Sequence, residues 1–254
     1  MTTHHSTAPA LTGRTALVTG ATRGVGLAIA RKLSTCGVDV LLNYAQDEEN
    51  AQRALKELAG LPGRVHAVKA DVTDDFDALC DEAGRRFGHL DILVHNTSYF
   101  RPAPTLATGP ALVDRSLAVA LHPLLAAAAR LAELMEGRSG RIVTVSSIGA
   151  RRVVPRYAAA GVAKAALESL VRYLAVELAG RGIAVNAVAA AKVDKGDGTV
   201  PPGIAEAITA RTPGGRLTTP EDVADAVSLL CTDEAGWLQG QVVTVDGGLS
   251  LVAG

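Results

Sequence analysis

The sequence contains little of what marks several classes of protein. Only 3% of its 254 residues are aromatic, and its three cysteines, Cys36, Cys80 and Cys231, are scattered without CxxC spacing. Isolated cysteines of this kind favour buried thiols in a reducing compartment over a disulfide framework or a metal site. We therefore expect a cytoplasmic protein without a metal centre, with a core built mainly from small side chains such as Ala and Val.

An excess of charge of one sign is also missing. The 25 Lys and Arg residues and 26 Asp and Glu residues leave a formal net charge of −1, and neither a basic tail nor a basic stripe is present. This balance argues against nucleic acid or an anionic membrane as the main partner. The apolar run over residues 117–129 is interrupted by His122 and Pro123 and is too short to span a bilayer.

The N-terminal segment lacks the basic region and apolar run of a signal peptide. We expect residues 1–11 to form a disordered tail ahead of a single domain over residues 12–254, since no linker or change of composition marks a second one.

Short apolar segments alternate with segments of helical periodicity along the whole chain. Because the apolar runs are continuous, they are typical of a parallel sheet that is buried on both faces. The sequence predicts an α/β protein with one doubly wound Rossmann fold, a seven-stranded parallel sheet flanked by helices, whose ligands bind beyond the carboxyl ends of the strands. The predicted strands are 16–18, 38–43, 65–70, 90–94, 141–145, 183–188 and 241–245, and the predicted helices are 24–36, 48–59, 74–87, 110–135, 156–179 and 220–230.

A glycine-rich turn, TGATRGVG over residues 19–26, follows the first predicted strand. Gly20 allows a tight turn, Gly24 allows close approach of a pyrophosphate to the backbone, and Gly26 lets the helix pack on the strand. In this position the turn predicts dinucleotide binding, through Gly20, Thr22, Arg23, Gly24, Val25 and Gly26.

The end of the second predicted strand bears on which dinucleotide binds. An NAD site usually carries an acid there, whereas this chain has Asn43. Arg23, in the glycine turn, offers a positive charge to a 2′-phosphate. Both residues favour NADPH/NADP over NAD, although Gln46 and Asp47 stand where a second basic residue would be expected.

Tyr157 and Lys164 lie seven residues apart on the predicted helix 156–179. Seven residues turn a helix by about 700°, so the two side chains should share a face, two turns apart. A nearby ammonium stabilises phenolate and lowers the pKa of a tyrosine, which makes the pair a plausible proton donor. Taken alone, the pair is better explained as a packed tyrosine and a solvated lysine.

Six features in one order give the pair a context. They are the TGxxxGxG turn, Asp71-Val72 after the third strand, Asn96 after the fourth, Ser146-Ser147 after the fifth, the Tyr/Lys helix, and VDGG at 245–248. Together they resemble the short-chain dehydrogenase/reductase family over about residues 12–250.

The resemblance implies a role for each feature. It implies that Asp71 and Val72 contact the adenine, and that Asn96 borders the ribose or supports the sheet. It further implies that Ser147 orients the substrate carbonyl, that Tyr157 donates a proton, and that Lys164 holds the nicotinamide ribose and depresses the pKa of the tyrosine.

The spacing of the Tyr/Lys pair departs from the usual YxxxK. Ala160, four residues before Lys164, has no proton to donate. The wider Y-x6-K spacing and its flanks are similar to the type III, NADPH-using enoyl-acyl carrier protein reductase branch. Setting the phenol back by three residues moves it about 4.5 Å along a helix. This suits conjugate reduction, where negative charge appears on a thioester oxygen, and such a donor supplies about 3 kcal/mol.

Other positions depart from the family pattern. His95-Asn96-Thr97-Ser98 replaces Asn-Asn-Ala-Gly, and we expect His95 to be a packed residue. Ala120 replaces a helix asparagine, and Lys195 replaces a threonine that helps to fix the nicotinamide. Val193 keeps the hydrophobic position whose backbone would hold the carboxamide. Residues 196–202, rich in Gly and Pro, are predicted to form a short mobile lid.

Three functions remain open from the sequence. The first is an enoyl-thioester reductase of fatty acid or polyketide biosynthesis, acting on an acyl group carried by acyl carrier protein or coenzyme A. The second is a carbonyl reductase that tailors a polyketide-like small molecule. The third is a nucleotide-binding member that has lost redox activity. The family resemblance also implies a homo-oligomer, a tetramer or a dimer, formed through apolar helix faces.

Overall fold

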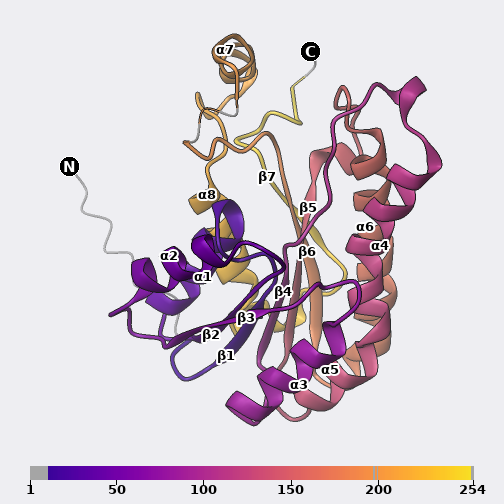
Figure 1. Cartoon of the computed structure of the whole chain (residues 1–254). Coiled ribbons are helices and arrows are strands. Elements are labelled where there is room, and N and C mark those ends of the chain that lie inside the picture. Colours follow the sequence, from indigo (N-terminus) through magenta and orange to yellow (C-terminus); the bar gives the residue numbers. More distant parts are fainter. Residues whose placement is uncertain (1–10, 197, 199, 253–254) are drawn as a thin grey trace.

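The computed structural model describes residues 11–196, 198 and 200–252. Over these residues, seven parallel strands form one sheet in the order β3-β2-β1-β4-β5-β6-β7, which confirms the predicted fold class (Figure 1). The strands are β1 (Thr15–Val18), β2 (Asp39–Tyr44), β3 (Val65–Lys69), β4 (Ile92–His95), β5 (Arg141–Ser147), β6 (Ala184–Ala190) and β7 (Val242–Val245).

Helices cover both faces of the sheet. One hydrophobic cluster joins α1, α2 and α8 to one face, and a second joins α3, α4, α5 and α6 to the other (Figure 1). The helices are α1 (Gly24–Thr35), α2 (Glu48–Leu58), α3 (Phe76–Phe87), α4 (Pro110–Ala126), α5 (Ala128–Leu134), α6 (Ala158–Ala179), α7 (Pro202–Arg211) and α8 (Pro220–Leu230), with short 3-10 turns η1 (Thr105–Ala107), η2 (Ile148–Ala150) and η3 (Glu234–Trp237).

The ends of several helices follow from local sequence. Asp47 caps α2 by accepting from the backbone nitrogen of Asn50 at 2.9 Å, and Thr219 and Asp222 form a reciprocal capping box at the start of α8. Gly88 ends α3 in the left-handed conformation, which costs glycine least.

The structure corrects four boundaries of the prediction. The single helix predicted over 110–135 is two helices bent by 48° about Ala127, one turn beyond Pro123. Helix α7 was not predicted, and since none of its residues is buried it carries no apolar stripe to reveal it. Helix α6 starts at Ala158, which leaves Tyr157 as its N-cap residue. Leu11, placed in the predicted tail, is 1% exposed and packs in the core.

Residues 1–10 of the predicted tail lie outside the described residues. Within the described part of the chain no single helix is long and apolar enough to cross a membrane, and α4 and α5 pass that test only as a bent pair. The outer face of α6 exposes Tyr173 and Val176, at 73% and 82%, yet an oligomer formed through this face stays a prediction.

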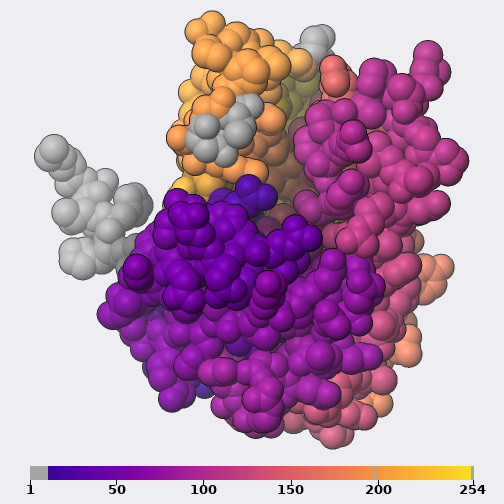
Figure 2. All heavy atoms as spheres, viewed as in Figure 1, coloured from indigo at the N-terminus to yellow at the C-terminus, as the bar shows by residue number. Residues whose placement is uncertain are grey.

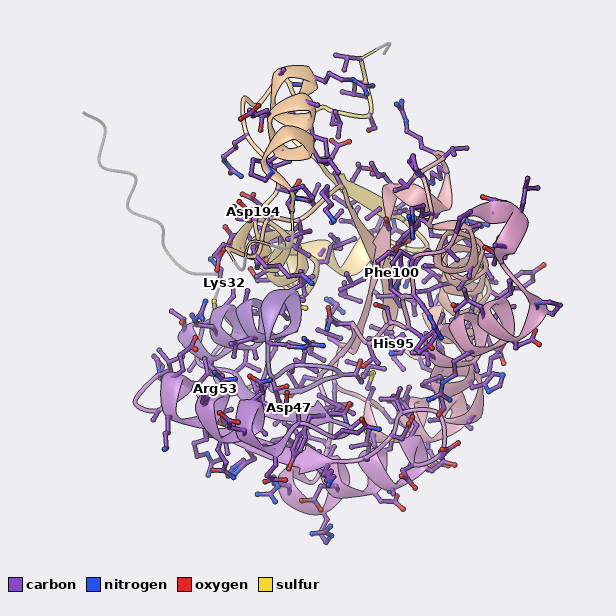
Figure 3. All side chains as sticks on the ribbon, turned by 45° about the horizontal axis from the view of Figure 1, so that its top comes forward. Lys32, Asp47, Arg53, His95, Phe100 and Asp194 are labelled. Atoms are coloured by element: carbon purple, nitrogen blue, oxygen red, sulfur yellow. The ribbon has the colours of Figure 1, made fainter. Side chains whose placement is uncertain are left out.

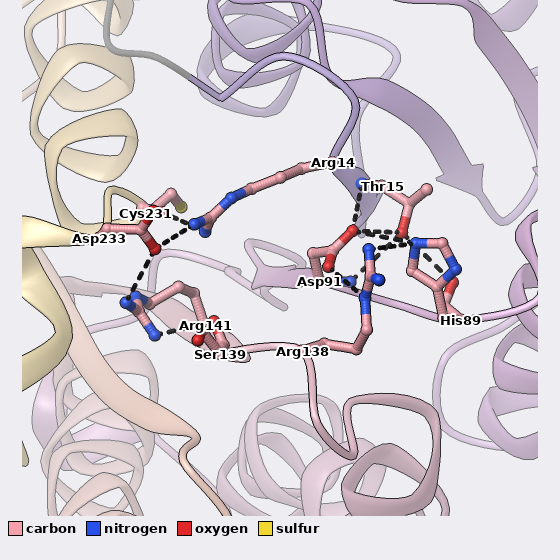
Figure 4. Close-up of polar contacts among 9 residues, drawn as sticks. All are labelled: Arg14, Thr15, His89, Asp91, Arg138, Ser139, Arg141, Cys231 and Asp233. Atoms are coloured by element: carbon pink, nitrogen blue, oxygen red, sulfur yellow. Dashed lines mark hydrogen bonds and ion pairs between the residues drawn. The ribbon is translucent and has the colours of Figure 1, made fainter.

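A polar cluster ties the strands together at the edge where their amino ends lie (Figure 4). The carboxylate of Asp91 is buried and accepts from the backbone nitrogen of Thr15 at 2.8 Å and from Nε of Arg138 at 3.0 Å. Nearby, Asp233 pairs with both Arg14 and Arg141. These contacts fix the start of β1 against β4 and β5, on the edge opposite the strand ends that carry the predicted site.

Replacing Asp91 by Ala should lower the free energy of unfolding by about 2 kcal/mol, because the buried N–H of Thr15 loses its acceptor and the exposed Arg138 loses its ion pair. Urea denaturation measures this. The matched control is Asp81→Ala, whose exposed carboxylate pairs with Arg130 and should contribute no more than about 0.5 kcal/mol. Equal midpoints for the two variants would contradict the role given to Asp91.

Candidate active site

The predicted site residues meet at the carboxyl edge of the sheet. Figure 2 shows a hollow there, between the segment that contains α7 and the segment that follows β4. In Figure 3 Phe100 and Asp194 flank the opening, and His95 lies at its base. Within the described residues, no group of three or more His, Cys, Asp or Glu could hold a metal ion.

The glycine turn is shaped by close backbone contacts. Gly20 and Gly24 have φ of 61° and 55°, and a Cβ at Gly26 would lie 2.2 Å from the carbonyl oxygen of Gly20. Asn96 supports the turn by donating from Nδ2 to the carbonyls of Thr19 and Gly20, each at 3.0 Å. Asn96 was predicted either to border the ribose or to support the sheet. These contacts agree with a supporting role.

The adenosine side of the turn also has its predicted residues in place. Asn43 is buried, donates to the carbonyl of Ala70 at 2.9 Å and accepts from the nitrogen of Gly20 at 3.4 Å. Its side chain therefore holds the turn in position. Asp71 accepts from the nitrogen and hydroxyl of Thr73, at 2.9 and 2.7 Å, and these bonds lower its pKa. Val72, beside it, is buried.

The outer rim of the turn carries the charge that could discriminate between dinucleotides. Thr22 is buried, Val25 packs partly on the core, and Arg23 is exposed at the N-cap of α1. Asp47 lies close by, and its pKa is lowered first by the hydrogen bonds of Asn50 and to a lesser extent by the charges of Arg53 and Arg23. Because Asp47 caps α2, its carboxylate is already engaged.

Tyr157 packs at the mouth of the site. Its ring centroid lies 5.2 Å from that of Phe100, and a Cβ on Gly149 would lie 2.6 Å from its ring carbons, so only glycine allows η2 to approach so closely. Burial raises the pKa of the phenol above its ordinary value, and the hydroxyl of Ser147 opposes that rise. The expected lowering of this pKa by Lys164 is thus wrong, because burial outweighs other effects on the phenol.

Lys164 lies beneath this mouth and is 6% exposed. Its Nζ donates to the carbonyl of Val145 at 2.6 Å, at the end of β5. Burial lowers the pKa of the ammonium to about 8, while the charge of Glu168 raises it. Lys164 therefore differs from the solvated lysine that the pair alone would also fit.

Glu168 was not singled out from the sequence. It lies one turn after Lys164, is 4% exposed, and accepts from Ser146 Oγ at 2.8 Å and from Arg151 Nε at 2.9 Å. Its place four residues after the candidate catalytic lysine is a signal that helix periodicity offers. The network joins β5, η2 and α6 around the buried ammonium.

Ser147 lies beside Tyr157, and His95 lies at the end of the neighbouring strand β4. Ser147 Oγ accepts from the nitrogen of Gly149 at 3.1 Å and starts η2. His95 is fully buried, and the pKa of its ring is lowered to about 4, first by burial and then by the charge of Lys164. A neutral, enclosed ring agrees with the expectation of a packed residue, and Ala120, on α4, is also buried.

The segment after β6 reaches back to the glycine turn. Val193 forms a parallel bridge with Thr218 and is partly buried. A Cβ at Gly24 would lie 3.5 and 3.6 Å from Cδ and Cε of Lys195 and would meet no other side chain of the described residues within 4 Å. The turn thus has open backbone with one ammonium-bearing chain over it, which fits a dinucleotide pyrophosphate. The predicted mobile lid includes residues 197 and 199, which lie outside the described residues.

Comparison with known proteins agrees with this geometry. Residues 20–250 match the family described as "Enoyl-(Acyl carrier protein) reductase". The chain belongs to the short-chain dehydrogenase/reductase family. Its fold is one that binds a nicotinamide cofactor, and the protein is an oxidoreductase of this family.

Three similar proteins span much of the family's chemistry. A 1-cyclohexenylcarbonyl-CoA reductase of Streptomyces collinus is 40% identical over 93% of this chain and 87% of its own. A short-chain dehydrogenase of Burkholderia cenocepacia, solved in complex with NADP, has a TM-score of 0.87 at 32% identity, covering 95% of this chain and 99% of that one. A promiscuous reductase that catalyses keto-reduction in lugdunomycin biosynthesis has a TM-score of 0.87 at 33% identity, covering 96% and 100%.

Replacing Glu168 by Gln should shift the alkaline limb of the pH–rate profile to lower pH. The charge of Glu168 raises the pKa of Lys164, so without it the ammonium loses its proton at lower pH and turnover falls several-fold at pH 8. Turnover at pH 6, where the lysine stays protonated, should change by no more than about twofold. Glu177→Gln, on the exposed side of the same helix, is the control, and identical profiles for the two variants would refute this role.

Replacing Lys195 by Ala should raise the dissociation constant for NADP(H) by about tenfold, the usual effect of losing one charged contact to a phosphate. The rate constant at saturating cofactor should change little. Titration calorimetry measures the affinity, and Lys192→Ala, also exposed, provides the control. Unaltered affinity in the Lys195 variant would show that the side chain does not reach the pyrophosphate.

Proposed function

We propose that this protein reduces the carbon–carbon double bond of an enoyl thioester with NADPH. The observation that carries the proposal is the position of Tyr157. It lies at the N-cap of α6, packed between Gly149 and Phe100, while the buried Ala160 occupies the position from which YxxxK enzymes donate. The phenolic donor of this helix is therefore set back from Lys164.

The chemistry follows from that placement. When bound, the nicotinamide supplies a hydride, which adds to the β-carbon of the enoyl thioester. The electron pair of the double bond moves towards the thioester carbonyl, and the Tyr157 hydroxyl stabilises the charge on its oxygen by donating a hydrogen bond. A proton taken up at the α-carbon completes the saturated thioester. Lys164 keeps a positive charge beneath the site, with Glu168 favouring its protonated form.

A second function has its own support. The Ser147 hydroxyl lies close enough to Tyr157 to influence its pKa, and two hydroxyls can flank the oxygen of a ketone as readily as that of a thioester. The keto-reducing relative has the same fold at 33% identity. A carbonyl reductase is thus the alternative against which the proposal must be tested.

NADPH oxidation with crotonyl thioester is the decisive assay, with butyryl thioester as the product. Tyr157→Phe should reduce turnover by about 10²–10³-fold, the usual loss for one donor to a developing oxyanion, with NADPH affinity nearly unchanged. Tyr173→Phe, at an exposed position on the same helix, is the matched control. Turnover of ketones without turnover of any enoyl thioester would select the alternative, and tight NADP binding with no turnover on either class would select a protein without redox activity.

The preference for NADPH is part of the proposal. Asn43 ends β2 without an acid, and the exposed Arg23 is placed at the rim of the glycine turn. Arg23→Ala should therefore lower the ratio of kcat/KM for NADPH to that for NADH by about tenfold or more. Arg23→Lys keeps the charge and should retain most of the preference. Equal use of the two cofactors by the parent protein would contradict it.

A further inference from the structure

Cations gather around the mouth of the site, although charge is balanced over the whole chain. No Asp or Glu occurs in residues 92–113 or 137–167. Six Lys and Arg residues fall in the second range, of which Arg138 and Arg141 belong to the opposite edge of the sheet (Figure 4). The other four, together with Arg101 from the first range, belong to the end where the substrate must enter.

Three of these five charges remain available to a ligand. Lys164 is buried, and Arg151 donates to Glu168 at 2.9 Å. Arg152 is exposed and donates to the backbone carbonyl of Ser250, a neutral acceptor. Arg101 and Arg156 are exposed, and among the described residues neither lies within ion-pair distance of a carboxylate. We call Arg101, Arg152 and Arg156 the arginine rim.

The rim is built by two loops that are joined next to Tyr157. The backbone nitrogen of Ala103 donates to the carbonyl of Arg156 at 3.2 Å. Arg101 follows Phe100 in the chain and Arg156 precedes Tyr157, and those two rings are 5.2 Å apart. Arg156 has φ of 63°, a left-handed conformation that is unfavourable for this residue type. The backbones of Arg101 and Arg156 are therefore held one residue from a packed aromatic pair.

The surface between the rim residues is apolar. Val153 and Val154, which separate Arg152 from Arg156, are 96% and 38% exposed, and Tyr99 and Phe100 are 37% and 53% exposed. Exposed apolar side chains grouped beside a site are a mark of ligand contact. The matching ligand carries an apolar part that enters beside Tyr157 and anionic groups that stay outside.

We propose that the arginine rim binds the phosphates of coenzyme A, so that the substrate of this site is a coenzyme A thioester. This inference rests on the proposed function. The pantetheine arm holds the phosphates well away from the thioester. Cations that bind these phosphates must therefore lie outside the pocket, as the arginines of the rim do. Guanidinium groups bind phosphate oxygens bidentately. A stable protein–protein interface buries about 1,200–2,000 Å² in total, whereas three arginines on two short loops suit a compact phosphate group.

Calorimetric titration in the presence of saturating NADP tests the rim without any turnover, and the bound cofactor prevents coenzyme A from occupying the dinucleotide site. Coenzyme A should bind at least tenfold more tightly than pantetheine, which lacks the phosphates. Arg101→Gln, Arg152→Gln and Arg156→Gln should each weaken coenzyme A binding by about three- to tenfold and leave pantetheine binding unchanged. Arg181→Gln, an exposed arginine beyond the end of α6, is the control, and unchanged NADP affinity shows that each variant is folded.

Kinetics with two substrates give the second arm. For crotonyl-CoA the rim variants should raise KM and leave kcat unchanged, and added salt should do the same in the parent protein. For crotonyl-N-acetylcysteamine, which has no phosphate, neither the rim variants nor added salt should change KM. Equal binding of coenzyme A and pantetheine, or rim variants that behave like Arg181→Gln, would overturn the proposal. An effect of the rim variants seen only with crotonyl-acyl carrier protein would also overturn the proposal, because it would show that the rim binds a carrier protein. Because the calorimetric arm needs no reduction, it can fail or succeed independently of the proposed enoyl reductase activity.

Discussion

The buried ammonium of Lys164 imposes the main constraint on this site. A charge removed from water is tolerated only where hydrogen bonds and an opposite charge compensate for the lost solvation. Here the carbonyl of Val145 accepts from Nζ at 2.6 Å, and Glu168, one helical turn later, provides the opposite charge. Glu168 is itself held by Ser146 and Arg151. The buried lysine is therefore surrounded by groups from a strand, a 3-10 turn and a helix, which hydrogen-bond or pair with one another.

The same network connects the interior to the mouth of the site. Arg151 ends η2, and η2 contains Gly149, against which the ring of Tyr157 packs. The ion pair between Arg151 and Glu168 thus helps to hold the surface on which the phenol rests. Charge compensation in the core and packing of the Tyr157 ring therefore involve one connected set of side chains.

Most of the fold could be predicted from the sequence, because continuous apolar runs mark buried parallel strands and glycines mark the phosphate turn. All seven strands are present, and the paired positions of the glycine turn, Asn43 and Asn96 are close in space as expected. The break at Ala127 and the exposed helix α7 were not predicted, since the first interrupts a continuous apolar pattern and the second has no buried face. Lys195 was noted only as a departure from the family pattern, and its position over Gly24 depends on a contact between segments distant in sequence. Glu168 was not singled out, because its burial and its partners are not visible in the sequence, and burial raises the pKa of Tyr157.

Lys195 places its alkyl chain over Gly24, so the strand-end segments of β1 and β6 are in contact across the hollow. The chain after Val193 is also joined to Thr218, by a backbone bond from Asp194 of 2.8 Å. Lys195 is exposed, so this contact between the two segments can open to admit a ligand to the backbone of Gly24.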